Sequence, residues 1–166
     1  MKKERGGWRP LQHEQLLQEV VHDTYKERRK LSEPTRCPHC EAVYRDGRWT
    51  WRKSSGPAHR VLCPACRRLR DRFPAGYVSM MGPFFRQHRE EIVALAHHCA
   101  QREGAEHPLE RIMKMEDICG GALLTTTSIH LARLIAEALG RSYKGELRYR
   151  YNRAENLLRA TWRRSD

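Results

Sequence analysis

Four of the six cysteines form two Cys-x-x-Cys pairs, Cys37 with Cys40 and Cys63 with Cys66. Two intervening residues allow a tight turn to bring both thiolates of a pair to one metal ion, and four thiolates complete the tetrahedral shell that zinc prefers. The full spacing, C-x2-C-x22-C-x2-C, is close to that of paired zinc-ribbon knuckles. We therefore expect these four residues to hold one zinc ion. Since such a shell leaves no open coordination position, the zinc would be structural rather than catalytic.

Other interpretations of the cysteines and histidines are weaker. A Cys-x-x-Cys pair can be a redox centre, but that motif stands at a strand-to-helix junction inside a βαβ unit, a context that neither pair has. The pairs could also be ordinary buried cysteines, yet a doubled spacing is hard to obtain by chance. His39 could replace a cysteine as a ligand, although four thiolates make this unnecessary. His97 and His98 could form a second site with Cys99 and Cys119, but neighbouring helical side chains point about 100° apart, so we favour a buried Cys99 beside exposed histidines.

The chain is strongly basic. Its 166 residues include 32 Lys and Arg against 20 Asp and Glu, which gives a formal charge of +12. Most of the excess lies in two blocks: residues 34–86 hold 11 basic and 3 acidic side chains, and residues 119–166 hold 9 and 4. Residues 87–118, with 4 basic and 7 acidic side chains, separate the blocks. Such an excess indicates an acidic partner, and nucleic acid is the first candidate.

Basic and aromatic residues are interleaved around the cysteine pairs. Arginine binds phosphate bidentately and aromatic rings stack on unpaired bases, so this mixture suits RNA with exposed bases. The alternative is a solvated face that only keeps the protein in solution, and we rank it lower because so much charge lies on one small zinc module. Double-stranded DNA fits less well, since the knuckle region shows no amphipathic helix for a major groove. The predicted RNA contacts here are Arg45, Arg48, Trp49, Trp51, Arg52, Lys53, Arg60, Arg67, Arg68 and Arg70.

The hydrophobic pattern predicts an α+β protein in which a small zinc ribbon precedes a compact module. Residues 1–33 are expected to form a basic helical segment, with Leu16, Leu17, Val20 and Val21 on one face. Residues 34–83 are expected to form the four-cysteine ribbon, with a linker at its end. Residues 84–166 then form an αββαββ module, in which helices cover one face of an antiparallel sheet.

Local signals set the boundaries inside this module. A helical period from residue 84 to residue 102 ends before Gly104, and Gly120-Gly121 supplies a hairpin turn between two strands. Thr127 or Ser128 caps the next helix, which Gly140 is expected to end. Two final strands then alternate apolar with basic positions. Their basic positions form a second predicted RNA surface, the arginine face, made of Arg148, Arg150, Arg159 and Arg163.

Several functional classes are excluded by what the sequence lacks. It has no nucleophile elbow, phosphate-binding loop, dinucleotide fingerprint or histidine-carboxylate metal motif, so we expect no enzyme and no small-molecule substrate. No apolar run approaches the roughly 18 residues of a membrane span. The charged first residues are followed by Gly6-Gly7-Trp8 instead of the apolar core of a signal peptide. We expect a cytoplasmic protein with no membrane partner.

Residues 34–166 resemble the NMD proteins, the archaeal and eukaryotic large-subunit adaptors that also have short bacterial relatives. The resemblance is carried by the two cysteine pairs and by Glu116-Asp117, Gly120-Gly121-Ala122-Leu123-Leu124-Thr125-Thr126-Thr127, Ile129-His130-Leu131-Ala132-Arg133, Ile135, Ala138-Leu139, Tyr143-Lys144-Gly145-Glu146-Leu147 and Leu158-Arg159-Ala160-Thr161-Trp162. It implies a zinc-stabilised, non-enzymatic protein that binds ribosomal RNA on the large subunit near its tRNA-binding face. The larger relatives carry more Cys-x-x-Cys pairs and added domains with nuclear transport signals, so this chain looks like a minimal bacterial form and a role in nuclear export is not expected.

We therefore expect a protein that is monomeric off the ribosome and acts on the ribosome by occupancy, in stability, assembly or stress-induced hibernation. One alternative is a stress regulator that binds mRNA or DNA through the same ribbon without a ribosome. Another is a protein-interaction module whose positive charge meets an acidic protein.

Overall fold

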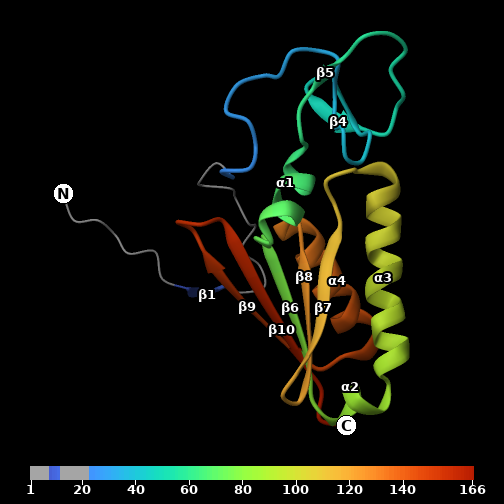
Figure 1. The fold of residues 1–166 in the computed structure, drawn as a ribbon. Helices are drawn as coiled ribbons and strands as arrows, with labels where there is room; N and C mark the ends of the chain where they lie inside the picture. Colours follow the sequence, from blue (N-terminus) through green and yellow to red (C-terminus); the bar gives the residue numbers. More distant parts are fainter. Residues whose placement is uncertain (1–7, 12–22) are drawn as a thin grey trace, which may run out of the picture.

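The computed structural model describes residues 8–11 and 23–166, which form a small ribbon at one end of a larger sheet backed by helices (Figure 1). In chain order, the elements are β1 (Arg9–Leu11), β2 (Thr35–Arg36), β3 (Val43–Arg45), β4 (Arg48–Thr50), β5 (His59–Arg60), α1 (Pro64–Asp71), β6 (Gly76–Met81), α2 (Pro83–Gln87), α3 (Arg89–Glu106), β7 (Ile112–Ile118), β8 (Gly121–Thr126), α4 (Ile129–Tyr143), β9 (Glu146–Asn152) and β10 (Leu157–Arg163).

The larger sheet has the strand order β1-β9-β10-β6-β8-β7. Its neighbours pair antiparallel except β6 and β10, which run parallel from the pair Gly76–Leu158 to the pair Met81–Arg163. The expectation of an antiparallel sheet is therefore wrong for this pairing. The segment before residue 84, expected as a linker, contains β6, which buries Val78 and Met80 in the middle of the sheet. The structure thus places β6 with the module rather than with the ribbon.

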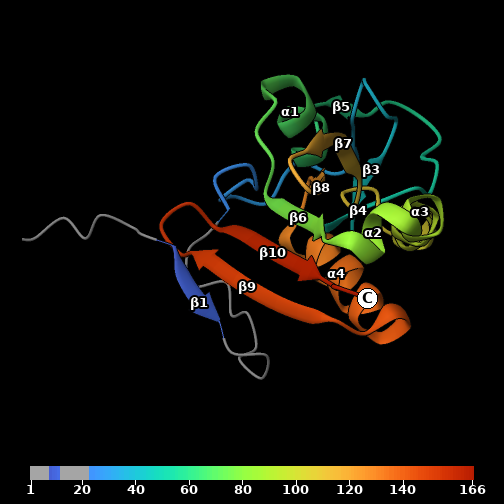
Figure 2. The same cartoon turned by 90° about the horizontal axis from the view of Figure 1, so that it is seen from below.

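Helices α3 and α4 supply the second layer. Helix α4 packs on β6, β8, β9 and β10, and α3 packs on α4; Figure 2 shows α4 behind β9 and β10, with β1 at the edge. Leu131, Ile135 and Leu139 recur at the four-residue spacing of one helical face and are fully buried. Trp162 is buried with them, and each such side chain contributes about 1.5–3 kcal/mol of burial free energy. The core of the protein therefore lies between α4 and the centre of the sheet.

The start of α4 was predicted correctly, but the ends of α3 and α4 differ from expectation. The Ser128 hydroxyl caps α4 by accepting a hydrogen bond from the backbone N–H of Leu131 at 3.0 Å. However, α3 continues through Gly104, and α4 continues through Gly140 to Tyr143. A glycine inside a helix costs only about 1 kcal/mol, and packing of the flanking turns outweighs that cost. The chain leaves α4 at Lys144, where φ is +59°.

The ribbon is a four-stranded sheet with the order β4-β3-β2-β5, followed by α1. The sequence shows no helical period in this region, yet α1 forms because Cys63 caps its first turn and Pro64 occupies its first position. The N-terminal segment also differs from expectation. Residues 9–11 form β1 on the edge of the larger sheet, and residues 23–33 contain turns but no helix. The apolar face predicted at residues 16–21 lies outside the described residues.

None of the helices in the described ranges is long and apolar enough to cross a bilayer.

Two glycine substitutions test the continuation of α4 through Gly140 and the close packing of β6 at Gly76. A methyl group at Gly140 would meet only Leu147 Cδ2 at 3.6 Å, so Gly140→Ala should raise the free energy of unfolding by about 0.5–1 kcal/mol. A methyl group at Gly76 would lie 2.4 Å from both Ala132 Cβ and Thr126 Oγ1, so Gly76→Ala should lower the free energy of unfolding by about 1–3 kcal/mol. Urea unfolding followed by tryptophan fluorescence measures both. A destabilising Gly140→Ala would mean that α4 ends at this residue.

Candidate metal centre and nucleic-acid interface

The four cysteines of the two pairs lie around one point. The sulfur atoms of Cys37, Cys40, Cys63 and Cys66 all lie within 4.8 Å of one another, and those of Cys40 and Cys63 are 3.7 Å apart. Zinc–sulfur bonds of about 2.3 Å at tetrahedral angles place neighbouring sulfurs about 3.8 Å apart. The donor set and the spacing therefore fit one four-coordinate metal ion, and the predicted clustering of these residues is confirmed.

Backbone hydrogen bonds hold both knuckles in place. In the first, the N–H of Cys37 donates to the Ala42 carbonyl at 2.8 Å and the N–H of Glu41 donates to the Cys37 carbonyl at 2.9 Å. In the second, the N–H of Cys66 donates to the sulfur of Cys63 at 3.4 Å at the start of α1. Each pair therefore sits on a turn that aims two sulfurs inward.

Burial and mutual repulsion shape the acidity of these thiols. Burial raises the pKa of Cys63 well above its usual range, and the neighbouring Cys40, Cys37 and Cys66 raise it further. Burial also acts against the thiolate of Cys37, but hydrogen bonds from the backbone of Cys63, Cys40 and His39 outweigh it and lower the pKa of Cys37 to about 7. Four ionised sulfurs so close together need a cation between them, which is what a bound metal supplies.

Arg111 is a member of this centre that sequence reasoning missed. Its guanidinium comes from the loop before β7 and approaches two of the sulfurs, with Nη1 3.3 Å from Cys66 Sγ and Nη2 3.7 Å from Cys63 Sγ. A divalent metal with four thiolates carries two excess negative charges, and Arg111 offsets one of them. Burial alone would lower the pKa of Arg111, but its contacts with Cys66 and Cys40 raise it instead.

Arg111 and the nearby end of α3 are connected to both parts of the protein. The Arg111 Nε donates to the Pro108 carbonyl at 2.8 Å, and its backbone N–H donates to Thr127 Oγ1 at 2.9 Å. On the ribbon side, Trp51 lies over Arg111, and its indole N–H donates to the Gly104 carbonyl at 2.6 Å. No local pattern marks Arg111, because its sulfur partners are 45 and 48 residues away.

One predicted RNA contact is wrong. Arg68 is 1% exposed. Its Nη2 pairs with Asp23 Oδ1 at 2.7 Å, its Nη1 donates to the Phe73 carbonyl at 3.0 Å, and Tyr25 stacks on its guanidinium. A buried arginine with these partners is a structural ion pair and is not accessible to a nucleic acid. Arg67, half-buried, is also engaged, because it pairs with Glu27.

The other predicted ribbon contacts lie at or near the surface. Six charged ones are exposed: Arg45, Arg48, Arg52, Lys53, Arg60 and Arg70. Arg70 pairs with Asp71. Trp49 is half-buried against the ribbon core and Trp51 is exposed. Strand β4 thus presents aromatic and basic side chains together.

The predicted arginine face lies on the side of the sheet opposite α4. Strands β9 and β10 alternate strictly over their central residues, with Tyr149, Tyr151, Ala160 and Trp162 buried beneath the helix layer. The exposed positions between them are Arg148, Arg150, Arg159 and Arg163. Because one face of these strands is committed to the core, the arginines are directed to the other.

The other histidines and cysteines considered as metal ligands do not form a cluster among the described residues. His39, His97, His98 and Cys119 are exposed, while Cys99 packs partly buried against the main core. Within the described ranges, the four-cysteine group is the only metal-ligand cluster. The preference for a packed Cys99 beside exposed histidines agrees with this arrangement.

No protein-family model matches the chain, and neither a curated protein nor a solved structure is significantly similar to it.

The role of Arg111 can be tested by metal competition. Arg111→Met keeps most of the side-chain length but removes the charge near the sulfurs. Changes in groups that support metal ligands typically lower metal affinity by about 10–100-fold, so a chelating dye should remove Zn²⁺ from this variant at correspondingly lower dye concentration. Arg102→Met, at an exposed position of α3, is the matched control. Equal Zn²⁺ affinities for the two variants would contradict the role assigned to Arg111.

Proposed function

We propose that this protein is a zinc-stabilised, non-enzymatic RNA-binding protein that docks on ribosomal RNA of the large subunit near the tRNA-binding face. It acts there by occupancy, in ribosome stability, assembly or hibernation under stress. The choice of zinc is supported by four thiolates clustered closely enough to surround one ion, the donor set typical of structural zinc.

The main support for RNA binding is the arrangement of side chains on the arginine face. Arg150 and Arg159 lie directly opposite each other on antiparallel strands, an arrangement in which like charges repel. Arg159 is held between two rings, 4.8 Å from the centroid of Trp8 and 4.6 Å from that of Tyr77. A phosphate group that accepts hydrogen bonds from both guanidinium groups would turn this repulsion into a binding site.

The surroundings of this pair favour a nucleic acid over a single small anion. Arg163 lies on the same face of β10, and Arg148 lies on the same face of β9, paired there with Glu146 at 2.6 Å. Such a row of cations suits a polymer with regularly spaced phosphates. Tyr77 and Trp8 add rings that can stack on exposed bases, which is typical of RNA recognition on an open sheet.

The assignment to the ribosome rests on the resemblance of residues 34–166 to the NMD proteins. Those proteins use a zinc-stabilised fold to occupy the large subunit. Two separate basic surfaces, β4 of the ribbon and the arginine face, suit a large RNA that is contacted at more than one place.

The metal proposal predicts one zinc ion per chain in mass spectrometry under native conditions. Cys37→Ser and Cys66→Ser should lose the metal and the fold of the ribbon, because the free energy of metal binding stabilises that region. Cys119→Ser, which changes an exposed cysteine outside the centre, should retain both. A folded ribbon in the metal-free protein, shown by unchanged hydrogen exchange at residues 35–66, would refute a structural role for zinc.

Salt dependence and sedimentation test the RNA proposal. The double variant Arg150→Ala/Arg159→Ala should bind deproteinised large-subunit RNA more weakly. Its plot of log affinity against log salt should be shallower by about 0.7–0.9 for each phosphate that the variant no longer neutralises. Arg102→Ala/Arg141→Ala removes the same charge from exposed positions on the helices and should leave the slope unchanged.

Sedimentation with purified large subunits is the companion measurement. The wild-type protein should travel with the subunit at low salt and separate from it at high salt. Protein that remains at the top of the gradient at low salt would contradict ribosome binding, and crosslinks scattered over messages or promoters would favour the ribosome-independent regulator.

A further inference from the structure

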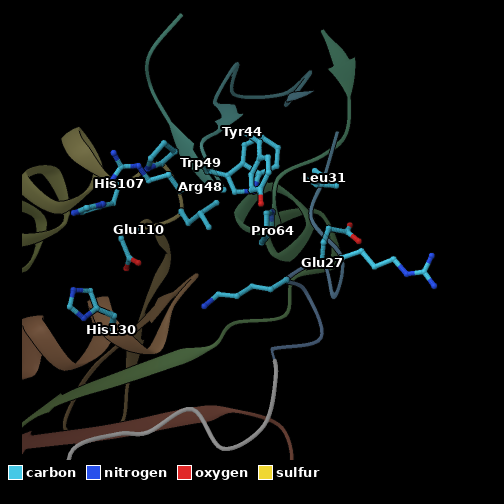
Figure 3. Close-up of a pocket in the computed structure, with 14 residues that line it drawn as sticks. Glu27, Leu31, Tyr44, Arg48, Trp49, Pro64, His107, Glu110 and His130 are labelled. Atoms are coloured by element: carbon cyan, nitrogen blue, oxygen red, sulfur yellow. The ribbon is translucent and has the colours of Figure 1, made fainter. Parts of the chain in front are cut away.

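A hollow of about 530 Å³ lies between the ribbon and the loop that precedes β7 (Figure 3). Its apolar lining comes from Tyr44 and Trp49 of the ribbon sheet, from Pro64 at the start of α1, and from Pro108 and Leu109 of the loop. Ligand sites in proteins typically measure about 300–1,000 Å³. The hollow therefore has the size and the apolar walls needed to take up a planar ring system.

Tyr44 and Trp49 form an aromatic pair beside this hollow. They face each other across β3 and β4, with ring centroids 5.6 Å apart and ring planes inclined by 65°. In an edge-to-face pair, at least one ring keeps both of its faces uncovered by its partner. A ring face that the partner ring leaves uncovered can stack on a nucleobase, a contact worth about 1–3 kcal/mol per base.

The charged groups around the hollow favour an anion. Lys26, Arg29 and Arg48 line it, and neither arginine has an ion-pair partner among the residues that the structure describes. Of the two carboxylates in the lining, Glu27 pairs with Arg67, whereas Glu110 accepts a hydrogen bond from the Ser128 hydroxyl and keeps its charge. The cations of the lining therefore outnumber its one carboxylate without an ion pair. The aromatic pair is thus surrounded by cations that can contact phosphate.

A second hollow, of about 520 Å³, is lined by residues 48–52 and by the end of α3. Arg48, Trp49 and His107 line both hollows, and Trp51 and Arg52 belong to the second. The two hollows therefore adjoin at these three residues. Trp49 and Trp51, with Arg48 and Arg52, place rings and cations together around the two hollows.

We propose that the first hollow binds one unpaired base of single-stranded RNA, which stacks on Tyr44 and Trp49 while the adjoining phosphates contact Arg48 and Arg52. This inference rests on the RNA binding proposed above and adds a preference for unpaired nucleotides at this place. An apolar peptide could fill the hollow by size, but it would leave Arg29 and Arg48 without anionic partners. A paired base cannot reach the rings, because its faces are covered by its neighbours in the helix.

A double-mutant cycle between protein and RNA tests the proposal. The probe is a short fluorescein-labelled single-stranded RNA, and it is compared with the same strand carrying abasic nucleotides, which keep the phosphates but lack the bases. Tyr44→Leu removes the stacking ring but keeps an apolar side chain. It should weaken binding of intact RNA by about 5-fold to 150-fold and leave binding of abasic RNA unchanged within twofold. The wild-type protein should lose at least this factor with abasic RNA.

The outcomes separate this proposal from RNA binding in general. Equal losses for Tyr44→Leu with intact and abasic RNA, or no loss with either, would overturn the base pocket. In that case Arg150→Ala/Arg159→Ala should still weaken both RNAs, and RNA binding would stand. If the wild-type protein bound neither RNA at low salt, the RNA-binding proposal itself would fail. If Tyr44→Leu lost its zinc, the comparison would be made with the wild-type protein alone. Equal affinities of the wild-type protein for intact and abasic RNA would then reject the base pocket.

Discussion

The close approach of four thiols, three of them buried, is the constraint on which the ribbon depends. The buried cluster of the ribbon consists of Cys37, Ala42, Cys63, Ala65 and Cys66, so the candidate ligands make up most of its interior. Besides the cysteines, Ala42, Val43 and Ala65 are buried and Trp49 and Leu62 pack partly buried against them. This apolar surface is small against the conformational entropy lost by ordering four short strands. A cation at the centre would remove the repulsion between the sulfurs and add the free energy of metal binding. The ribbon is thus organised by charge, whereas the helix-backed sheet is organised by apolar packing.

The same charge balance links the two parts of the protein. Arg111 belongs to the loop before β7, but its guanidinium lies against two sulfurs of the ribbon. Trp51 makes the reciprocal connection, since it belongs to the ribbon and donates to the Gly104 carbonyl of α3. The arginine excess of the chain therefore has three uses. Arg68 forms a buried ion pair with Asp23, and Arg111 is a counterion at the candidate metal centre. The arginines of β4, β9 and β10 are surface groups.

Local features could be predicted from the sequence, and long-range partnerships could not. The cysteine quartet, the turn at Gly120 and the cap at Ser128 depend on residues a few positions apart, and the structure has each of them. The exposed arginines of β9 and β10 followed from strict alternation. Strand β6 gave a weak signal, because glycine, serine and two methionines hide its alternation and its partners lie far along the chain. The roles of Arg68 and Arg111 depend on partners 45 or more residues away, where no spacing rule applies.

The parallel pairing of β6 with β10 has a consequence for how the protein forms during synthesis. Of the six strands in the larger sheet, β10 is the last to be made, yet it lies between β6 and β9 near the middle. Until β10 has left the ribosome, one side of β6 has no partner and Trp162 is missing from the core. The ribbon does not depend on β10, because its strands and candidate ligands lie between residues 35 and 66 and the arginine at its sulfurs is Arg111. On a nascent chain the four cysteines can therefore come together, and the basic strand β4 can form, before the larger sheet has closed.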